Sequence, residues 1–306
     1  MALALAGYVE LPPHAGAGGF DHAAVDSAGR VYVAHTANDA IDVIDGAARR
    51  YVRSIPGLRA VAGALVSDDD LVFTSNRGEN TVGIFSASEV TPVTKVKVGV
   101  RPNGLAYDPG RRRVLAANVG DPAVPDSFTL SLVDVGRETR VAEIPVAGRT
   151  RWTVFDGGAD AFHVNIADPP QIVTVSAGDP ANIRRIVPMP SAGPHGLDLD
   201  AAGRRLFCAC DGMELIEVDA DSGDLGRRAA LAGVPDVIFF NAALGCLYVA
   251  IGDPGVIEVF DVRGMRRREA VTTEPGAHTL AFDAATQTVY AFLPVTHRAA
   301  VYVDRP

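Results

Sequence analysis

The 306-residue sequence has little that would support a disulfide framework. Its three cysteines, Cys208, Cys210 and Cys246, are an odd number, and their spacing matches no zinc site. Cys208 and Cys210 would lie on one face of one strand, where neighbours cannot easily reach disulfide geometry. We expect all three to be reduced residues in or near the core, which favours a reducing compartment.

Long apolar runs and a basic excess are also missing. No stretch reaches the roughly 18 apolar residues of a membrane-spanning helix, so no membrane partner is expected. The N-terminus, MALALAGYVELPP, lacks the basic region of a secretory signal. These observations predict a cytoplasmic protein, or a periplasmic or secreted one if a leader was removed.

The net charge of −9 argues against a nucleic-acid partner, which would require a basic surface to displace phosphate counterions. The densest basic groups are residues 111–113 and 266–268, each of them three arginines. Both groups fall at expected turns, where short charge runs are usually solvated.

What the sequence does have is a repeat of a little over forty residues. Its 31 glycines and 20 prolines recur between short apolar runs, as in many strands joined by tight turns. Equivalent turn positions are Asp26, Ser67, Asp108, Asp156, Asp200, Asn241 and Asp283. The differences between these positions are 41, 41, 48, 44, 41 and 42. This pattern predicts an all-β, seven-bladed β-propeller with four antiparallel strands in each blade.

The expected single domain covers residues 1–306. Its blades are placed at about 17–57, 58–99, 100–148, 149–191, 192–233, 234–276, and 277–304 plus 2–12. The seventh unit ends at VYVD with only three strands, while residues 7–12 match the pattern of a fourth strand. We therefore expect the N-terminal strand to complete the last blade and close the ring.

The units VYVAHTANDAIDVID and VFTSNRGENTVGIFS resemble the YVTN-type propeller repeat family. The resemblance covers essentially the whole chain and implies the propeller fold. That family includes binding proteins and members of unknown role, so it implies no particular activity. A looser similarity links the chain to propeller lyases and lactonases that hold a divalent metal on the axis, although their tryptophan- and glutamate-containing blade motifs are missing.

Candidate site residues stand five positions before each turn residue, on the strands that line the channel. This column reads Asp21, Ala62, Asn103, Arg151, His195, Asp236 and His278, with His22 beside its first member. Six of the seven are polar or ionisable, which predicts a wet central cavity. Trp152, the only tryptophan, is predicted either to form an aromatic wall beside an anion-binding Arg151 or to pack between blades.

A second column ends the second strand of each blade. Asn76, Asn118 and Asn165 stand there and are expected to cap turns, whereas blade 1 has His35. The insertion at residues 120–126 lengthens a loop in blade 3 and could cover a channel mouth.

The histidines of these columns are the main functional signal. We expect His22, His35, His195 and His278 to converge as ligands of a divalent metal. Alternatively His22, His195 and His278 act as general acids and bases on a bound molecule, or each simply bonds a loop carbonyl. Ligand contacts are assigned to Asp21, His35, Asn103, Arg151, Trp152 and Asp236.

Two functions follow from this pattern. The first is binding of a small molecule on the propeller axis, with a metal-assisted hydrolase or lyase as its catalytic form. The second is a non-enzymatic scaffold that holds a protein partner on its rim or face. The sequence alone leaves both open.

Overall fold

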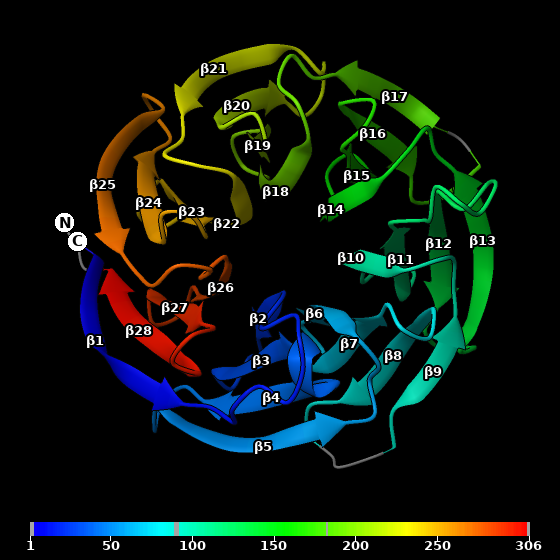
Figure 1. Ribbon diagram of the computed structural model, residues 1–306. Helices are drawn as coiled ribbons and strands as arrows, with labels where there is room; N and C mark the ends of the chain where they lie inside the picture. The colour runs from blue at the N-terminus through cyan, green and yellow to red at the C-terminus, as the bar shows by residue number, and fades with distance from the viewer. Residues whose placement is uncertain (1–2, 89–91, 182, 305–306) are drawn as a thin grey trace.

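Seven four-stranded antiparallel sheets stand around a central axis, so the predicted seven-bladed β-propeller is confirmed (Figure 1). The computed structural model describes residues 3–88, 92–181 and 183–304. Within each of the first six sheets, the strands follow the sequence from the axis outward.

The strand bounds repeat the same unit around the ring. Blade 1 has β2 (Ala23–Val25), β3 (Arg30–His35), β4 (Ala40–Asp45) and β5 (Arg50–Pro56). Blade 2 has β6 (Val61–Val66), β7 (Leu71–Asn76), β8 (Thr81–Ser86) and β9 (Thr94–Lys97). Blade 3 has β10 (Pro102–Asp108), β11 (Arg113–Asn118), β12 (Thr129–Asp134) and β13 (Thr139–Pro145). Blade 4 has β14 (Thr150–Asp156), β15 (Ala161–Ile166), β16 (Gln171–Ser176) and β17 (Ile183–Pro188).

The other three blades continue the pattern. Blade 5 has β18 (Pro194–Asp200), β19 (Arg205–Cys210), β20 (Glu214–Asp219) and β21 (Leu225–Ala230). Blade 6 has β22 (Pro235–Asn241), β23 (Cys246–Ile251), β24 (Val256–Asp261) and β25 (Arg266–Thr272). Blade 7 has β26 (Thr279–Asp283), β27 (Thr288–Leu293), β28 (Arg298–Asp304) and, as its outer strand, β1 (Leu3–Glu10). A 3-10 turn, Thr36–Asn38, follows β3.

Burial explains why the sequence pattern changes from strand to strand. The second strands, such as β15 and β23, are buried at every position because a neighbouring sheet covers each of their faces. The outer strands, such as β13 and β21, are mostly exposed and therefore polar. The apolar-to-polar gradient along each repeat is thus a gradient from the inside of the blade to its rim.

The hydrophobic core lies between the blades. One cluster of buried side chains fills each of the seven contacts between neighbouring sheets. Phe73 and Val114, for example, belong to the cluster between blades 2 and 3, and Val31 and Tyr290 to the one between blades 7 and 1. Each sheet is therefore stabilised by both neighbours, and the ring must close for all of them to be covered.

The predicted N-terminal clasp is confirmed. Strand β1 pairs antiparallel with β28, from Leu3 opposite Asp304 to Glu10 opposite Arg298. Leu3 joins the cluster between blades 6 and 7, and Val9 joins the one between blades 7 and 1. One strand therefore links two of the seven cores, and Figure 1 shows its neighbour β28 as the last strand of the chain.

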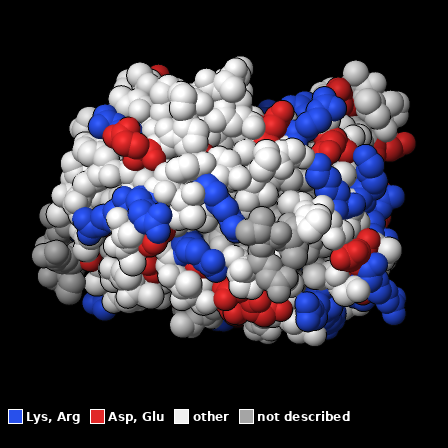
Figure 2. Space-filling model, turned by 90° about the horizontal axis from the view of Figure 1, so that it is seen from below, with Lys and Arg blue, Asp and Glu red and all other residues white. Residues whose placement is uncertain are grey.

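The outer edge of the ring carries both signs of charge. Figure 2 shows one side of it, on which Lys and Arg are interspersed with Asp and Glu. Ion pairs such as Lys95 with Glu79, whose Nζ and Oε1 atoms lie 2.8 Å apart, fit this mixture. Across the described residues, no helix has the length and apolar character needed to cross a membrane.

The clasp gives a first prediction. Val9→Asp places a carboxylate where the side chain is 2% exposed and should lower the melting temperature by roughly 5–10 °C, because burying an unpaired charge costs several kcal/mol. Leu5→Asp on the same strand, where the side chain is 50% exposed, is the control and should change the melting temperature little. Thermal unfolding followed by circular dichroism measures both, and equal shifts for the two variants would contradict the role of Val9.

Candidate functional site

The inner strands bring distant parts of the sequence to one end of the channel. Strands β2, β6, β10, β14, β18, β22 and β26 surround the axis in Figure 1. We call the end at which they begin the entry mouth, and the opposite end the exit mouth. Polar residues at the entry mouth form what we call the entry cluster: Asp21, His22, Arg77, Asn103, Arg151, His195, Asp211, Asp236 and His278.

His195 is the residue that connects most of this cluster. It lies near the start of β18, and its side chain is 13% exposed. Its Nδ1 lies 2.8 Å from Oδ1 of Asp211, and its Nε2 lies 3.2 Å from Oδ1 of Asp236. Burial acts to lower the pKa of His195, but the negative charge of Asp236 and the hydrogen bonds to Asp211 and Asp236 outweigh it and raise that pKa to about 9. The ring is therefore an imidazolium at neutral pH.

Asp236 lies among three of the predicted histidines. Besides His195, it has Nε2 of His278 at 3.9 Å and His22 nearby. Burial acts to raise the pKa of Asp236, yet the charge and the hydrogen bond of His195, with smaller effects of the other two histidines, lower it. His22, His195 and His278 therefore converge around a carboxylate that stays ionised.

Arg151 brings a second positive charge against His195. Its Nη1 lies 2.9 Å from Nε2 of His195, and its Nη2 lies 3.3 Å from Oδ2 of Asp211. A protonated imidazole cannot accept a hydrogen bond from a guanidinium, so this contact joins two cations. Among the described residues, the buried Nε of Arg151 has no hydrogen-bond partner. Two cations in contact favour negative charge beside them, and Asp211 and Asp236 supply part of it.

More arginines stand beside Arg151. Arg101, Arg149 and Arg151 line a pocket of about 740 Å³ together with residues of the blade 3 insertion. The pKa of Arg149 is lowered by burial and by the positive charges of Arg151, Arg77 and Arg101. We call this space the arginine pocket, and it opens beside the entry cluster because Asp211 lines it as well. Gly120 and Pro122 of the insertion line this pocket, and a cover over the channel mouth stays a prediction.

Blades 1 to 3 form the opposite side of the mouth. Arg77 Nη1 lies 3.2 Å from Oδ2 of Asp21, and Arg77 Nη2 donates to Oδ1 of Asn103 at 2.5 Å. Asp21 also lies 3.4 Å from Nε2 of His22. These contacts hold Asp21 and Asn103 in place at the rim.

Trp152 and His22 lie deeper in the channel. Their ring centroids are 4.0 Å apart. Both residues also line a second cavity, which occupies the exit half of the channel. Burial lowers the pKa of His22, so its ring is neutral at neutral pH. This tilted pair lies where the entry cluster meets the rest of the channel.

His35 does not join the other predicted histidines. It is fully buried at the seam between the N-terminal segment and blade 1. Its Nδ1 lies 2.7 Å from Oδ2 of Asp42, and its Nε2 lies 2.7 Å from Nδ1 of His14. The rings of His297 and His14 make an edge-to-face contact, with their centroids 4.4 Å apart. These four residues form a separate network, which we call the seam network.

One of the predicted caps, Asn165, supports the site from outside the entry cluster. Asn165 donates through Nδ2 to the carbonyl oxygens of His195 and Gly196, at 2.9 and 3.2 Å, and so fixes the start of β18.

Gly193, just before β18, has φ +60°, and a Cβ at that position would lie 2.5 Å from Oδ2 of Asp211. Glycine is required there both for the backbone conformation and for the approach of the carboxylate.

Sequence reasoning missed Arg77, Arg101, Arg149 and Asp211 as site residues. Arg77 and Asp211 occupy one repeat position, directly after the second strand of blades 2 and 5. Arg101 and Arg149 occupy another repeat position, two residues before the candidate site residues Asn103 and Arg151. Inspection of these neighbouring columns for charge would have found all four.

The donor groups do not form a ready metal site. Within residues 3–88, 92–181 and 183–304, no three His, Cys, Asp or Glu side chains are arranged to hold a metal ion. Both ring nitrogens of His195 face carboxylates, and Nδ1 of His278 bonds the carbonyl of Gly276 at 2.7 Å. The metal assignment to His22, His35, His195 and His278 stays a prediction, and no step is derived through a metal here.

Comparison with known proteins identifies the fold. No family model matches the sequence, and a comparison with curated proteins found no match. Solved structures with similar folds include hydrazine synthase of Kuenenia stuttgartiensis, with a TM-score of 0.81 and 12% identity over 92% of this chain and 95% of that one. A chain of the mitotic checkpoint complex has a TM-score of 0.84 and 8% identity over 100% and 93% of the two chains. Streptogramin B lyase has a TM-score of 0.81 and 13% identity over 97% and 96%.

These similarities establish the seven-bladed β-propeller. At such low identity they carry no activity to this chain. Two enzymes and a chain of a protein assembly appear among them, so the shared fold is compatible with catalytic and with scaffold roles.

The charge state of His195 can be measured directly. Asp211→Asn should lower the pKa of His195 from about 9 by about one pH unit, because it removes a charged hydrogen-bond partner. An NMR titration of the His195 ring gives both values, with the exposed Asp224→Asn as control. A His195 that titrates near 6.5 in the wild-type protein would contradict the ion-pair network.

The same pKa has a consequence for stability. Because the pKa of His195 is higher in the folded protein than its ordinary 6.5, its ion pairs contribute fully below about pH 6.5. That contribution is lost as the pH rises through about 9.

The seam network predicts the opposite pH dependence. Burial, and then the charges of His35 and His297, lower the pKa of His14, so the fold favours its neutral form. Stability from this group is therefore present above about pH 6.5 and lost as the pH falls below it. We expect His14→Asn to lose less melting temperature than the wild type between pH 7.5 and pH 5. An equal loss in both proteins would show that His14 does not titrate on unfolding.

Proposed function

We propose that the entry mouth binds a small organic anion, a carboxylate or a phosphate ester, through Arg149 and Arg151. The observation that carries this proposal is the contact of the Arg151 guanidinium with the protonated His195, next to further arginines of the arginine pocket. A bidentate guanidinium matches the geometry of either anion. A bound anion would lie in the arginine pocket against the guanidinium groups of Arg149 and Arg151.

The charge distribution supports a ligand with a second polar end. Arginines gather on blades 2 to 4, whereas Asp211, Asp236, His195 and His278 come from blades 5 to 7. A molecule with its anionic group in the arginine pocket would reach His195 and Asp236 with its other end. The pocket volume of about 740 Å³ is in the range of small-molecule sites.

His195 and Asp236 are suited to hold the second end of such a ligand by charge. The raised pKa of His195 and the lowered pKa of Asp236 keep both groups ionised at neutral pH, so one can donate a charged hydrogen bond to the ligand and the other can accept one. The hydrogen bond from Nδ1 to Asp211 fixes the orientation of the ring. A hydrolase or a lyase that acts on an organic anion is the catalytic form of this proposal.

The scaffold alternative has less support. Exposed large hydrophobic side chains such as Val52, Val141, Ile186 and Leu225 lie on outer strands of different blades. Among the described residues, the exposed large hydrophobic side chains are spread over six of the seven blades, whereas a docking face would gather them in one patch. A protein partner therefore stays a prediction without a surface assigned to it.

The anion proposal predicts stabilisation by ligand. Succinate and phenyl phosphate, tested against sodium chloride of equal ionic strength, should raise the melting temperature of the wild-type protein. At a hundredfold excess over the dissociation constant, the stabilisation is about 2.7 kcal/mol. The increase should disappear in Arg149→Ala and Arg151→Gln and should persist in Arg112→Ala, whose arginine is an exposed turn residue.

Two further results would bear on this proposal. The affinity for the anion should fall as the pH passes about 9, since His195 then loses its positive charge. Equal stabilisation of the wild type and Arg149→Ala would contradict binding in the arginine pocket.

A further inference from the structure

A second cavity occupies the other half of the channel. It lies between the Trp152–His22 pair and the exit mouth, has a volume of about 490 Å³, and we call it the exit chamber. Its walls include aromatic side chains of blades 3, 4, 6 and 7, namely Tyr107, Phe155, Phe239 and Phe282. A cavity of this size with mostly apolar walls is typical of a small-molecule site.

Two carboxylates line this apolar space, those of Asp68, which is exposed, and Asp198. Asp198 stands two residues before the turn residue of blade 5, where the other blades have Ala24, Leu65, Ala106, Val154, Phe239 and Ala281. Its Oδ2 accepts the N–H of Phe240 at 2.6 Å, and its Oδ1 accepts the N–H of Leu199 at 2.8 Å. Over the described part of the chain, no Lys, Arg or His side chain pairs with it.

The apolar surroundings of Asp198 therefore destabilise its ionised form. Burial raises the pKa of Asp198 to about 6, against the smaller lowering effect of its two backbone hydrogen bonds. The other titratable groups that line the chamber are His22, Asp68 and Tyr107. Of these, His22 is neutral at neutral pH because burial lowers its pKa, so it supplies no countercharge.

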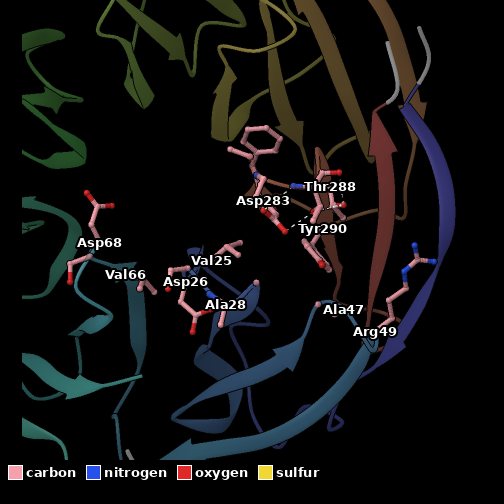
Figure 3. A pocket seen from close by; sticks show the side chains of 18 residues that line it. Val25, Asp26, Ala28, Ala47, Arg49, Val66, Asp68, Asp283, Thr288 and Tyr290 are labelled. Carbon is pink, nitrogen blue, oxygen red and sulfur yellow. Dashed lines mark hydrogen bonds between the residues drawn. The ribbon is translucent and has the colours of Figure 1, made fainter. Parts of the chain in front are cut away.

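A cleft leads from the exit chamber toward the rim between blades 7 and 1. It has a volume of about 810 Å³ and shares Val25, Val66, Asp68 and Phe282 with the chamber. Figure 3 shows Asp26 on the blade 1 side and Asp283 on the blade 7 side.

Both of these carboxylates already have partners. Asp26 accepts from Arg30 Nε at 2.6 Å, and Asp283 accepts from the Thr286 hydroxyl at 2.6 Å. The cleft thus offers a path lined by acidic residues. The carboxylate of Asp198, by contrast, has no cationic partner among the described residues.

We infer that the exit chamber binds a small hydrophobic amine, whose ring lies against the aromatic walls and whose ammonium group pairs with Asp198. Aromatic faces attract cations as well as apolar groups, so both parts of such a ligand match the walls. The ammonium would donate to the lone pairs of the carboxylate that the two backbone N–H groups leave free. This site is separate from the anion site and does not depend on it.

Trp152 provides the measurement, since it is the only tryptophan and lines the chamber. Phenethylamine should change its fluorescence in a saturable way. Phenethyl alcohol, which has nearly the same shape without the charge, should bind at least about tenfold more weakly, as expected when a charged hydrogen bond is lost. This ratio in the wild-type protein decides the question without any variant.

Variants then locate the site. Asp198→Asn should reduce the affinity for the amine to that for the alcohol, and the exposed Asp224→Asn should leave both unchanged. Ala24→Leu, which fills part of the chamber, should weaken amine and alcohol alike. Equal binding of amine and alcohol to the wild type, or an unchanged ratio in Asp198→Asn, would overturn the inference. Neither result would affect the anion proposal, which is tested with other probes and with arginine variants.

Discussion

A propeller sheet has middle strands that are apolar on both faces, and such a sheet is stable only when both faces are covered. In this chain, seven clusters of buried side chains provide that cover. The last contact exists because β1 pairs with β28 and brings Val9 into the cluster between blades 7 and 1. Closure makes all seven inner strands begin at one mouth, so residues remote in sequence, such as Asp21 and Arg77, come into contact.

The entry cluster shows how this geometry produces unusual charge states. His195 is surrounded by Asp211 and Asp236 and carries a proton, whereas His22 is buried against Trp152 and does not. The two histidines come from blades 1 and 5, which are not neighbours in the ring, and they meet only because their inner strands begin at the same mouth. Environment, and not residue type, assigns their roles.

Much of this architecture could be predicted from the sequence, because a repeat fixes equivalent positions. The spacing of the turn residues predicted the number and the bounds of the blades. The missing fourth strand of the last unit predicted that the N-terminal strand completes it. The meeting of His22, His195 and His278 also followed from equivalence, since each stands at or beside the start of an inner strand. These inferences need only the period of the repeat and the fact that the ring closes.

The rest depends on features that do not repeat. His35 ends the second strand of blade 1, but the N-terminal segment crosses that strand end and brings His14 onto its ring. Arg77 and Asp211 follow second strands, and only the direction of their side chains places them in the mouth. Such directions are set by loop conformation, as with the left-handed Gly193 that makes room for Asp211, and a periodic pattern carries no information about them.

The contact of Trp152 with His22, whose ring centroids lie 4.0 Å apart at an angle of 42°, joins the two ends of the channel. His22 belongs to the polar entry cluster, and both residues line the aromatic exit chamber. A ligand that moved the Trp152 indole in the chamber would therefore disturb a residue of the entry cluster. The movement of a single ring is thus a direct physical route by which occupancy at one end of the propeller could be sensed at the other.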